Sequence, residues 1–206
     1  MITTGELPPI EAREDVPDVA GWNSGDMEDI RLTLNGDGAA YARLVERYQA
    51  GISARMWRFT RERAKHRELV QDVFVEAYLH LKTFRGEAPF GHWLARIGTR
   101  VGYHHWRKEA RERSNQMVPL EDWDQPVWKE SESVEPEKDA EMLHSLLELL
   151  RPRDRLVLML RYVENRSIEE TAELTGWTRT MVKVQAWRAR SKLRKLFEAA
   201  GVEVER

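Results

Sequence analysis

The chain has no cysteine among its 206 residues. This absence excludes disulfide bonds, thiolate nucleophiles and cysteine-ligated zinc, and it fits a reducing compartment. Long apolar runs are also missing, because the longest one, Leu156 to Leu160, is far shorter than the roughly eighteen residues of a membrane span. Residues 1–10 lack the basic start and apolar core of a signal peptide. We therefore expect a cytoplasmic protein.

A large net charge is lacking too, but the formal value of −2 is a sum of segments of opposite sign. Residues 1–36, 112–138 and 198–206 carry net charges of −6, −5 and −2, whereas residues 37–111 and 139–197 carry +7 and +4. This pattern predicts two basic modules that face a polyanion, preceded and separated by acidic segments.

Strand signals are the third absence, since the sequence has no alternating apolar pattern, hairpin turn or internal repeat. Apolar residues keep helical spacing from Gly38 to about Lys65, from Leu69 to Leu81, from Leu143 to Leu150, and from Pro152 to about Val163. We predict an all-α protein of two small helical domains, residues 37–111 and 139–197.

The remaining segments are acidic, and residues 1–36 and 112–138 also contain several prolines. Residues 1–36 are expected to be a mostly disordered arm, residues 112–138 a flexible acidic linker, and residues 198–206 a tail. Trp123 and Trp128 are unusual in a free linker. Either this stretch lies along another protein or groove, or the two tryptophans fold back onto a neighbouring domain.

Aromatic rings and arginines alternate between Phe84 and Arg113. A helix from about Pro89 would place Trp93 and Ile97 on an apolar face, and we expect both residues in the core. A second face carries Arg96, Arg100, Tyr103 and Arg107. Since arginine holds phosphate and aromatic rings stack on bases, this segment predicts a grip for single-stranded nucleic acid.

The second basic module ends in signals for a helix-turn-helix. Ser167 and Glu170 form a capping box that begins one helix, Gly176 can end it, and Thr178 can cap the next. On that next helix the inward positions are Val182, Ala186, Ala189, Leu193 and Leu196.

The same helix carries a basic stripe of Arg179, Lys183, Trp187, Arg190 and Arg194. A helix of this kind fits the major groove of DNA, where basic side chains donate to guanine edges or to phosphates. We expect Arg179, Thr180, Lys183 and Gln185, near the helix start, to contact bases. Arg190 and Arg194 are expected to hold the DNA backbone.

With these motifs in this order, residues from about 37 to 196 resemble the extracytoplasmic-function class of bacterial RNA polymerase sigma factors. The resemblance implies an alternative sigma factor that binds core RNA polymerase, captures the melted minus-ten promoter element with its first domain, and recognises the minus-thirty-five element with its second. It also implies an anti-sigma factor as a partner, association with the nucleoid through polymerase, and no enzyme activity, cofactor or metal.

The resemblance assigns residues to each partner. The segment 69–78 is similar to the core-binding helix of the family, segment 84–97 to its minus-ten loop and helix, and segment 167–193 to its minus-thirty-five reader. The core-binding candidates are Leu69, Gln71, Asp72, Phe74, Glu76 and Tyr78. The minus-ten candidates are Phe84, Arg85, Phe90, Trp93, Arg96, Arg100, Tyr103 and Arg107. The minus-thirty-five candidates are Arg179, Thr180, Lys183, Gln185, Trp187, Arg190 and Arg194.

Two segments depart from the family pattern. Arg100 stands where an asparagine is common, and the usual Thr-Val-Lys-Ser-Arg becomes residues 181–185, Met-Val-Lys-Val-Gln. We expect these changes to alter promoter preference without abolishing DNA binding.

Two other classes explain parts of the sequence. A helix-turn-helix regulator that binds duplex DNA without polymerase would account for residues 139–197, but not for segments 69–78 and 84–113. A metal-dependent enzyme could use a set of histidines and one glutamate. These candidate ligands are His66, His80, His92, His104, His105, Glu109 and His144.

Overall fold

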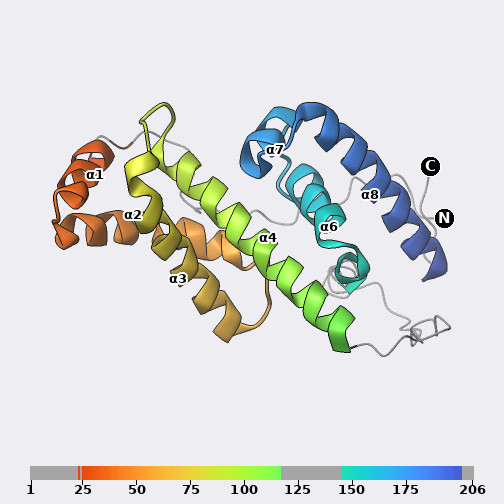
Figure 1. Cartoon of the computed structure of the whole chain (residues 1–206). Helices are drawn as coiled ribbons and strands as arrows, with labels where there is room; N and C mark the ends of the chain where they lie inside the picture. Colours follow the sequence, from red (N-terminus) through yellow and green to blue (C-terminus); the bar gives the residue numbers. More distant parts are fainter. Residues whose placement is uncertain (1–22, 24, 117–144, 201–206) are drawn as a thin grey trace, which may run out of the picture. The chain divides into compact units, whose positions relative to one another are not determined.

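The computed structural model describes residues 23, 25–116 and 145–200 (Figure 1). These residues divide between two compact units, 1–102 and 103–206. Within the described ranges the regular structure is helical and no strand occurs, which confirms the all-α prediction. Most of the predicted linker, with Trp123 and Trp128, lies outside the described residues, as do residues 1–22.

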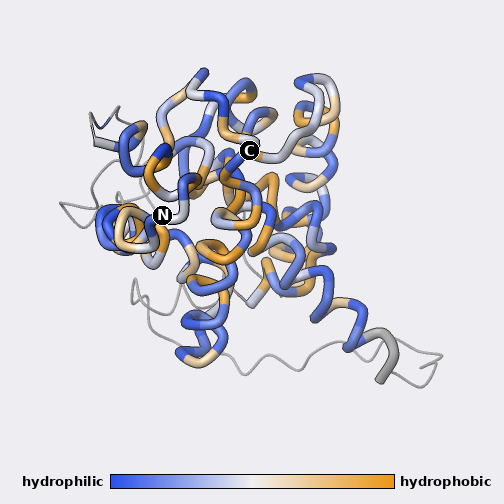
Figure 2. Tube along the Cα trace, turned by 60° about the vertical axis from the view of Figure 1, so that its left-hand side comes forward, coloured by the Kyte–Doolittle hydropathy of each residue, from blue (hydrophilic) through white to orange (hydrophobic). Residues whose placement is uncertain are grey.

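The first unit contains four α-helices and one short 3-10 helix among its described residues. They are α1 (Asp26–Leu34), α2 (Gly38–Met56), α3 (Arg63–His80), η1 (Leu81–Thr83) and the start of α4 (Phe90–Gln116). The helices contain both hydrophobic and hydrophilic residues (Figure 2), and the apolar side of each helix faces the core. The buried residues include Leu44, Ile52, Met56, Val73 and Leu94.

Two sequence expectations differ from this arrangement. Residues 26–34, assigned to a mostly disordered arm, form helix α1 and bury Asp26, Asp29, Ile30 and Thr33 against the unit. The helical spacing predicted from Gly38 to about Lys65 is interrupted after Met56, because residues 57–62 form a turn before α3 begins. Helix α1 has local signals, because Asp26, Glu28 and Asp29 lie in its first turn and Gly36, with a φ of 98°, follows its end.

Helix α4 approaches the rest of the first unit through glycines. A Cβ atom on Gly98 would lie 3.3 Å from the Met56 side chain, and one on Gly102 would lie 2.4 Å from the Phe59 ring. Phe59 is 2% exposed. The absence of a side chain at Gly102 therefore lets the ring lie directly against the α4 backbone.

The second unit holds the remainder of α4, a helical turn at residues 145–149, α6 (Pro152–Leu158) and the π-helix η2 (Met159–Val163). It also holds the helix-turn-helix, which is formed by α7 (Ile168–Thr175) and α8 (Arg179–Ala199). Its core gathers Leu150, Val157, Leu158, Val182 and Ala189, with Leu193 and Leu196 packed against them. The inward face predicted for α8 is thus confirmed; Leu143 lies outside the described residues.

Candidate partner-binding and nucleic-acid interfaces

Helix α3 carries the six core-binding candidates, and the structure separates them into two sets. Leu69 and Phe74 are 4% and 9% exposed, so they belong to the core of the first unit. Gln71, Asp72 and Tyr78 are exposed, and Glu76, half-buried, pairs with His80 at 3.3 Å. The buried pair can position α3, but the other four are the side chains that a partner could contact.

Exposed apolar side chains adjoin this set. Val75, Tyr78 and Leu79 are 48%, 54% and 60% exposed. Val75 and Leu79 are not among the core-binding residues predicted from the sequence. The signal was present, because apolar residues at positions 75, 78 and 79 follow helical spacing on a side other than the core stripe through Leu69, Val73 and Ala77.

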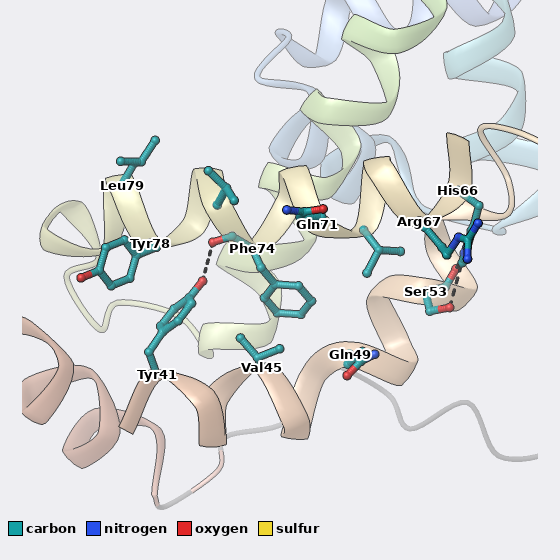
Figure 3. A pocket seen from close by; sticks show the side chains of 12 residues that line it. Tyr41, Val45, Gln49, Ser53, His66, Arg67, Gln71, Phe74, Tyr78 and Leu79 are labelled. Carbon is teal, nitrogen blue, oxygen red and sulfur yellow. Dashed lines mark hydrogen bonds between the residues drawn. The ribbon is translucent and has the colours of Figure 1, made fainter. Parts of the chain in front are cut away.

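A groove of about 620 Å³ lies between α2 and α3 and is lined mostly by apolar side chains (Figure 3). Tyr41 crosses it from α2, and its hydroxyl donates to the Phe74 carbonyl oxygen at 2.5 Å. The rings of Tyr41 and Tyr78 meet edge to face with centroids 5.0 Å apart. Burial raises the pKa of Tyr41 to about 12, so the hydroxyl remains a donor throughout the neutral range.

His66 closes the other end of this groove. Its ring stacks on Trp57 with centroids 3.8 Å apart, and its Nε2 atom lies 2.9 Å from the Ser53 carbonyl oxygen. His66 is 7% exposed. These contacts are those of a structural histidine that joins α2 to α3.

The minus-ten candidates at the start of α4 form an aromatic cluster. Phe84, Phe90 and Trp93 have ring centroids 5.4 to 5.5 Å apart, and Tyr48 of α2 meets Phe90 at 5.4 Å. Phe90 is 2% exposed, so it supports the cluster from within, whereas Phe84 and Trp93 are half-buried. Ile97 is buried as predicted; Trp93 keeps part of its ring at the surface.

Exposed arginines lie near this cluster in the sequence. Arg85 lies in the loop before α4 with its side chain 81% exposed, and Arg96 and Arg100 are exposed on α4. Further along the helix, the Arg107 guanidinium lies 5.9 Å from the centroid of the half-buried Tyr103 ring. Cationic groups beside partly exposed rings suit a strand of unpaired nucleotides.

A buried ionic cluster fixes α1 beside this region. Arg47 donates to Asp26 at 2.6 Å and to Asp29 at 2.9 Å, Arg43 donates to Asp29 at 2.8 Å, and the Tyr48 hydroxyl donates to Asp26. Both aspartates are about 5% exposed. Burial raises the pKa of Asp29, but the hydrogen bonds from Arg43 and Arg47 outweigh it and leave the pKa below 3.8.

The helix-turn-helix has the predicted caps. The Ser167 hydroxyl accepts from the Glu170 amide at 3.0 Å, and the Glu170 carboxylate accepts from the Ser167 amide at 2.7 Å. This backbone hydrogen bond lowers the pKa of Glu170. Gly176 has a φ of 73°, and the Thr178 hydroxyl accepts from the Met181 amide at 3.2 Å. These features confirm where α7 begins and ends and where α8 begins.

Six of the seven minus-thirty-five candidates lie exposed on α8. They are Arg179, Thr180, Lys183, Trp187, Arg190 and Arg194. Trp187 is 70% exposed, and the Arg190 guanidinium lies 5.7 Å from the centroid of the Tyr162 ring. The predicted stripe is therefore accessible to a partner along the length of the helix.

Gln185 is the exception, and its predicted base contact does not fit the structure. Its Nε2 atom donates to the Asp154 carboxylate at 2.5 Å, and Lys192 donates to the other carboxylate oxygen at 2.6 Å. Asp154 is 1% exposed. Gln185 thus faces α6 and ties α8 to it, because satisfying a buried carboxylate outweighs solvent exposure of the amide.

The histidines proposed as metal ligands are scattered. His105 and Glu109 share one face of α4 at 3.3 Å, as their spacing predicts. Across residues 23, 25–116 and 145–200, no group of three or more potential side-chain ligands gathers. His144 lies outside those ranges. Among the same residues, no helix has both the length and the apolar content to cross a membrane.

Comparison with known proteins identifies both modules. Residues 44–112 match the family described as Sigma-70 region 2, and residues 140–193 match Sigma-70, region 4. RNA polymerase sigma factor YlaC of Bacillus subtilis (strain 168) is 29% identical over 157 residues, 74% of this chain and 88% of YlaC. The ECF RNA polymerase sigma-E factor of Haemophilus influenzae is 29% identical over 173 residues, 80% of this chain and 90% of that protein.

A solved structure supports the fold. The co-crystal structure of the sigma factor RpoE in complex with the anti-sigma factor NepR from Bartonella quintana matches with a TM-score of 0.51 and 20% identity, covering 77% of this chain and 96% of that chain. The matches at the level of sequence span both modules in their order. The chain therefore belongs to the extracytoplasmic-function (ECF) class of bacterial RNA polymerase sigma factors, which direct promoter-specific transcription initiation.

Proposed function

We propose that the chain divides promoter-specific initiation among three surfaces. The exposed side of α3 binds core polymerase, the start and basic face of α4 capture the melted minus-ten strand, and α8 recognises the minus-thirty-five duplex. The carrying observation is that one chain joins a capped, basic helix-turn-helix to a second basic helix that begins in an aromatic cluster.

Strand capture requires no chemistry from the protein. Phe84 and Trp93 offer partly exposed rings, and Arg96 and Arg100 offer charge. Contacts that exist only with the open strand shift the equilibrium towards melting, since a ligand favours the state that it binds more tightly. The factor would thus work in the cytoplasm by binding alone, with no catalytic residue, cofactor or metal.

Reconstitution with bacterial core polymerase tests this proposal. The full chain added to core enzyme should give transcripts from specific start sites, whereas a helix-turn-helix regulator of duplex DNA would bind its site without core and give none. Failure of the chain to bind core polymerase would contradict the sigma assignment of these surfaces.

The core-binding surface has its own test. Replacing both Tyr78 and Leu79 with serine removes two exposed apolar side chains from α3, so affinity for core polymerase should fall at least tenfold, since each contact is worth about 1 kcal/mol or more. Leu34→Ser is the matched control, because Leu34 is 53% exposed and belongs to α1, not to α3. Fluorescence anisotropy of labelled protein measures both. Equal losses of affinity in the two variants would contradict the assignment of α3 as the core-binding surface.

The resemblance also implies an anti-sigma factor. The RpoE structure described above contains the anti-sigma factor NepR. For this chain we propose that such a partner would cover the exposed apolar side of α3 and so exclude core polymerase. Competition between the two for the Tyr78 and Leu79 surface is the expected signature.

A further inference from the structure

The outward centre of α8 is apolar, although the helix as a whole is basic. Successive side chains turn by about 100° around a helix axis, so the side opposite the buried Val182, Ala186 and Ala189 carries Val184, with Thr180 and Trp187 beside it. Val184 and Trp187 are 42% and 70% exposed. Neither packs into the core of the second unit.

Basic side chains border this apolar strip on both edges. Exposed Lys183, Arg190 and Arg194 lie along one edge, and exposed Arg188 and Lys195 lie along the other. A helix in a major groove has a phosphate backbone on each side, and its outermost side chains face the base edges. The charge pattern therefore matches DNA, with Val184 and Trp187 directed at bases and the flanking cations at the two backbones.

The chemistry of the strip limits what it can recognise. Valine has no hydrogen-bonding group, and duplex bases remain stacked, so an indole cannot insert between them without unstacking energy. The apolar feature that the major groove offers is the 5-methyl group of thymine. Building on the minus-thirty-five role proposed above, we infer that Val184 and Trp187 recognise thymine in that element through its methyl group.

The experiment removes that methyl group alone. A promoter duplex is first selected from a pool randomised in the upstream element, using the full chain with core polymerase. Each thymine of that element is then replaced singly by deoxyuridine, which keeps every hydrogen bond and lacks the methyl. Affinity of the wild type should fall about fourfold at one or two positions, because each methyl group loses a buried contact.

Variants connect those positions to residues. Val184→Ser and Trp187→Ser should each bind the thymine and deoxyuridine forms equally at one sensitive position. Both residues are exposed, so these changes leave the core intact. Leu149→Ser, at a leucine that is 53% exposed outside α8, is the control and should keep the wild-type difference.

The outcomes separate this inference from the proposed function. If the wild type binds its selected promoter but no deoxyuridine changes its affinity, thymine recognition is wrong and the minus-thirty-five role stands. If Trp187→Ser lowers the affinity for the thymine and deoxyuridine forms by the same factor, the wild-type difference between the two forms is kept. Trp187 then contacts the backbone instead. If no promoter is selected at all, the proposed function itself fails.

Discussion

At the scale of single residues, Gly102 has no room for an added methyl group. Alanine there would place Cβ 2.4 Å from the buried Phe59 ring. The cost of overpacking, about 1–3 kcal/mol, should exceed the roughly 1 kcal/mol that alanine gains over glycine inside a helix. Urea denaturation of Gly102→Ala should therefore show a lower free energy of unfolding than the wild type.

Gly38 provides the matched control for this change. It begins α2 and shows no left-handed φ, and a Cβ atom added there would have no heavy atom within 4 Å. Gly38→Ala should leave stability unchanged or raise it slightly, because alanine restricts the unfolded chain. Destabilisation by both substitutions alike would mean that contact with Phe59 is not the cause.

Two neighbours on α8 should respond differently to truncation. Gln185→Ala leaves the buried Asp154 with one partner fewer, so it should cost about 1–3 kcal/mol of stability and leave base preference unchanged. Lys183→Ala removes an exposed cation, so it should alter base preference by roughly 1–3 kcal/mol and leave stability unchanged. Thermal melting and binding to a panel of promoter variants measure the two effects. A change in base preference with Gln185→Ala would restore the predicted base contact.

The same residues show what can be predicted at this scale. Ser167 and Glu170 were identified correctly because a capping box depends on residues three apart in the sequence. The bond from Gln185 to Asp154 and the burial of Leu69 and Phe74 could not be predicted from the pattern alone, since they depend on neighbours contributed by other helices. Gln185 also means that one departure from the family pattern lies on the packed side of α8, not on its DNA-facing side.

At the scale of elements, the docking of α1 depends on ionised aspartate. The pKa of Asp29 is lowered in the folded protein, so the carboxylate stabilises the fold fully above its unfolded value of about 3.8 and loses that contribution as the pH falls through the folded pKa. Helix α1 should therefore remain protected at neutral pH and open on acidification below about pH 4. Amide exchange of residues 26–34 measures this opening.

A substitution and its control isolate the ionic cluster. Asp29→Asn should increase exchange in α1 at pH 7 and flatten its pH dependence, because Arg43 and Arg47 lose a charged acceptor. Glu28→Gln on the same helix is the control, since the Glu28 pair with Arg31 is exposed and such pairs contribute little. If Glu28→Gln opened α1 as much as Asp29→Asn, general helix propensity would explain the docking.

Helix α1 also marks the limit of prediction for elements. Prolines, glycines and weak apolar periodicity in residues 1–36 suggested disorder, but two of the acidic residues in α1 are paired with arginines from α2 that lie 14 to 21 positions further along the chain. Composition counts charges without their partners. Helices α4 and α8 were predicted well because each carries a long apolar periodicity of its own, whereas α3 begins at Arg63, before the predicted start at Leu69.

At the scale of the whole molecule, opposite charges in successive segments make DNA binding sensitive to salt. Arg190→Ala and Arg194→Ala each remove one phosphate contact under the proposed function, so each should weaken binding similarly across sequences and reduce the salt slope by about one. Titrations of promoter DNA at several salt concentrations give the slope. A change in specificity larger than the change in affinity would mean that these arginines contact bases.

The order of the modules was predictable from the sequence, and the comparisons confirm it. Charge blocks and helix caps depend on residues that are close together in the chain, so they can be recognised from the sequence. The exposure of Val75 and Leu79 could not be predicted, because an apolar residue in a helical pattern is usually a core residue. Their exposure becomes visible only when the packing of the neighbouring helices is known.

The π-helix η2 has a consequence for chain length. Its hydrogen bonds span five residues, as in the bond from the Glu164 amide to the Met159 carbonyl oxygen at 2.9 Å, so one turn holds a residue more than an α-helical turn would. A chain shorter by one residue at 159–163 could close the same turn as an ordinary α-helix and keep Ser167 at the start of α7. Loss of one residue from this segment would therefore leave α7 and α8 in place.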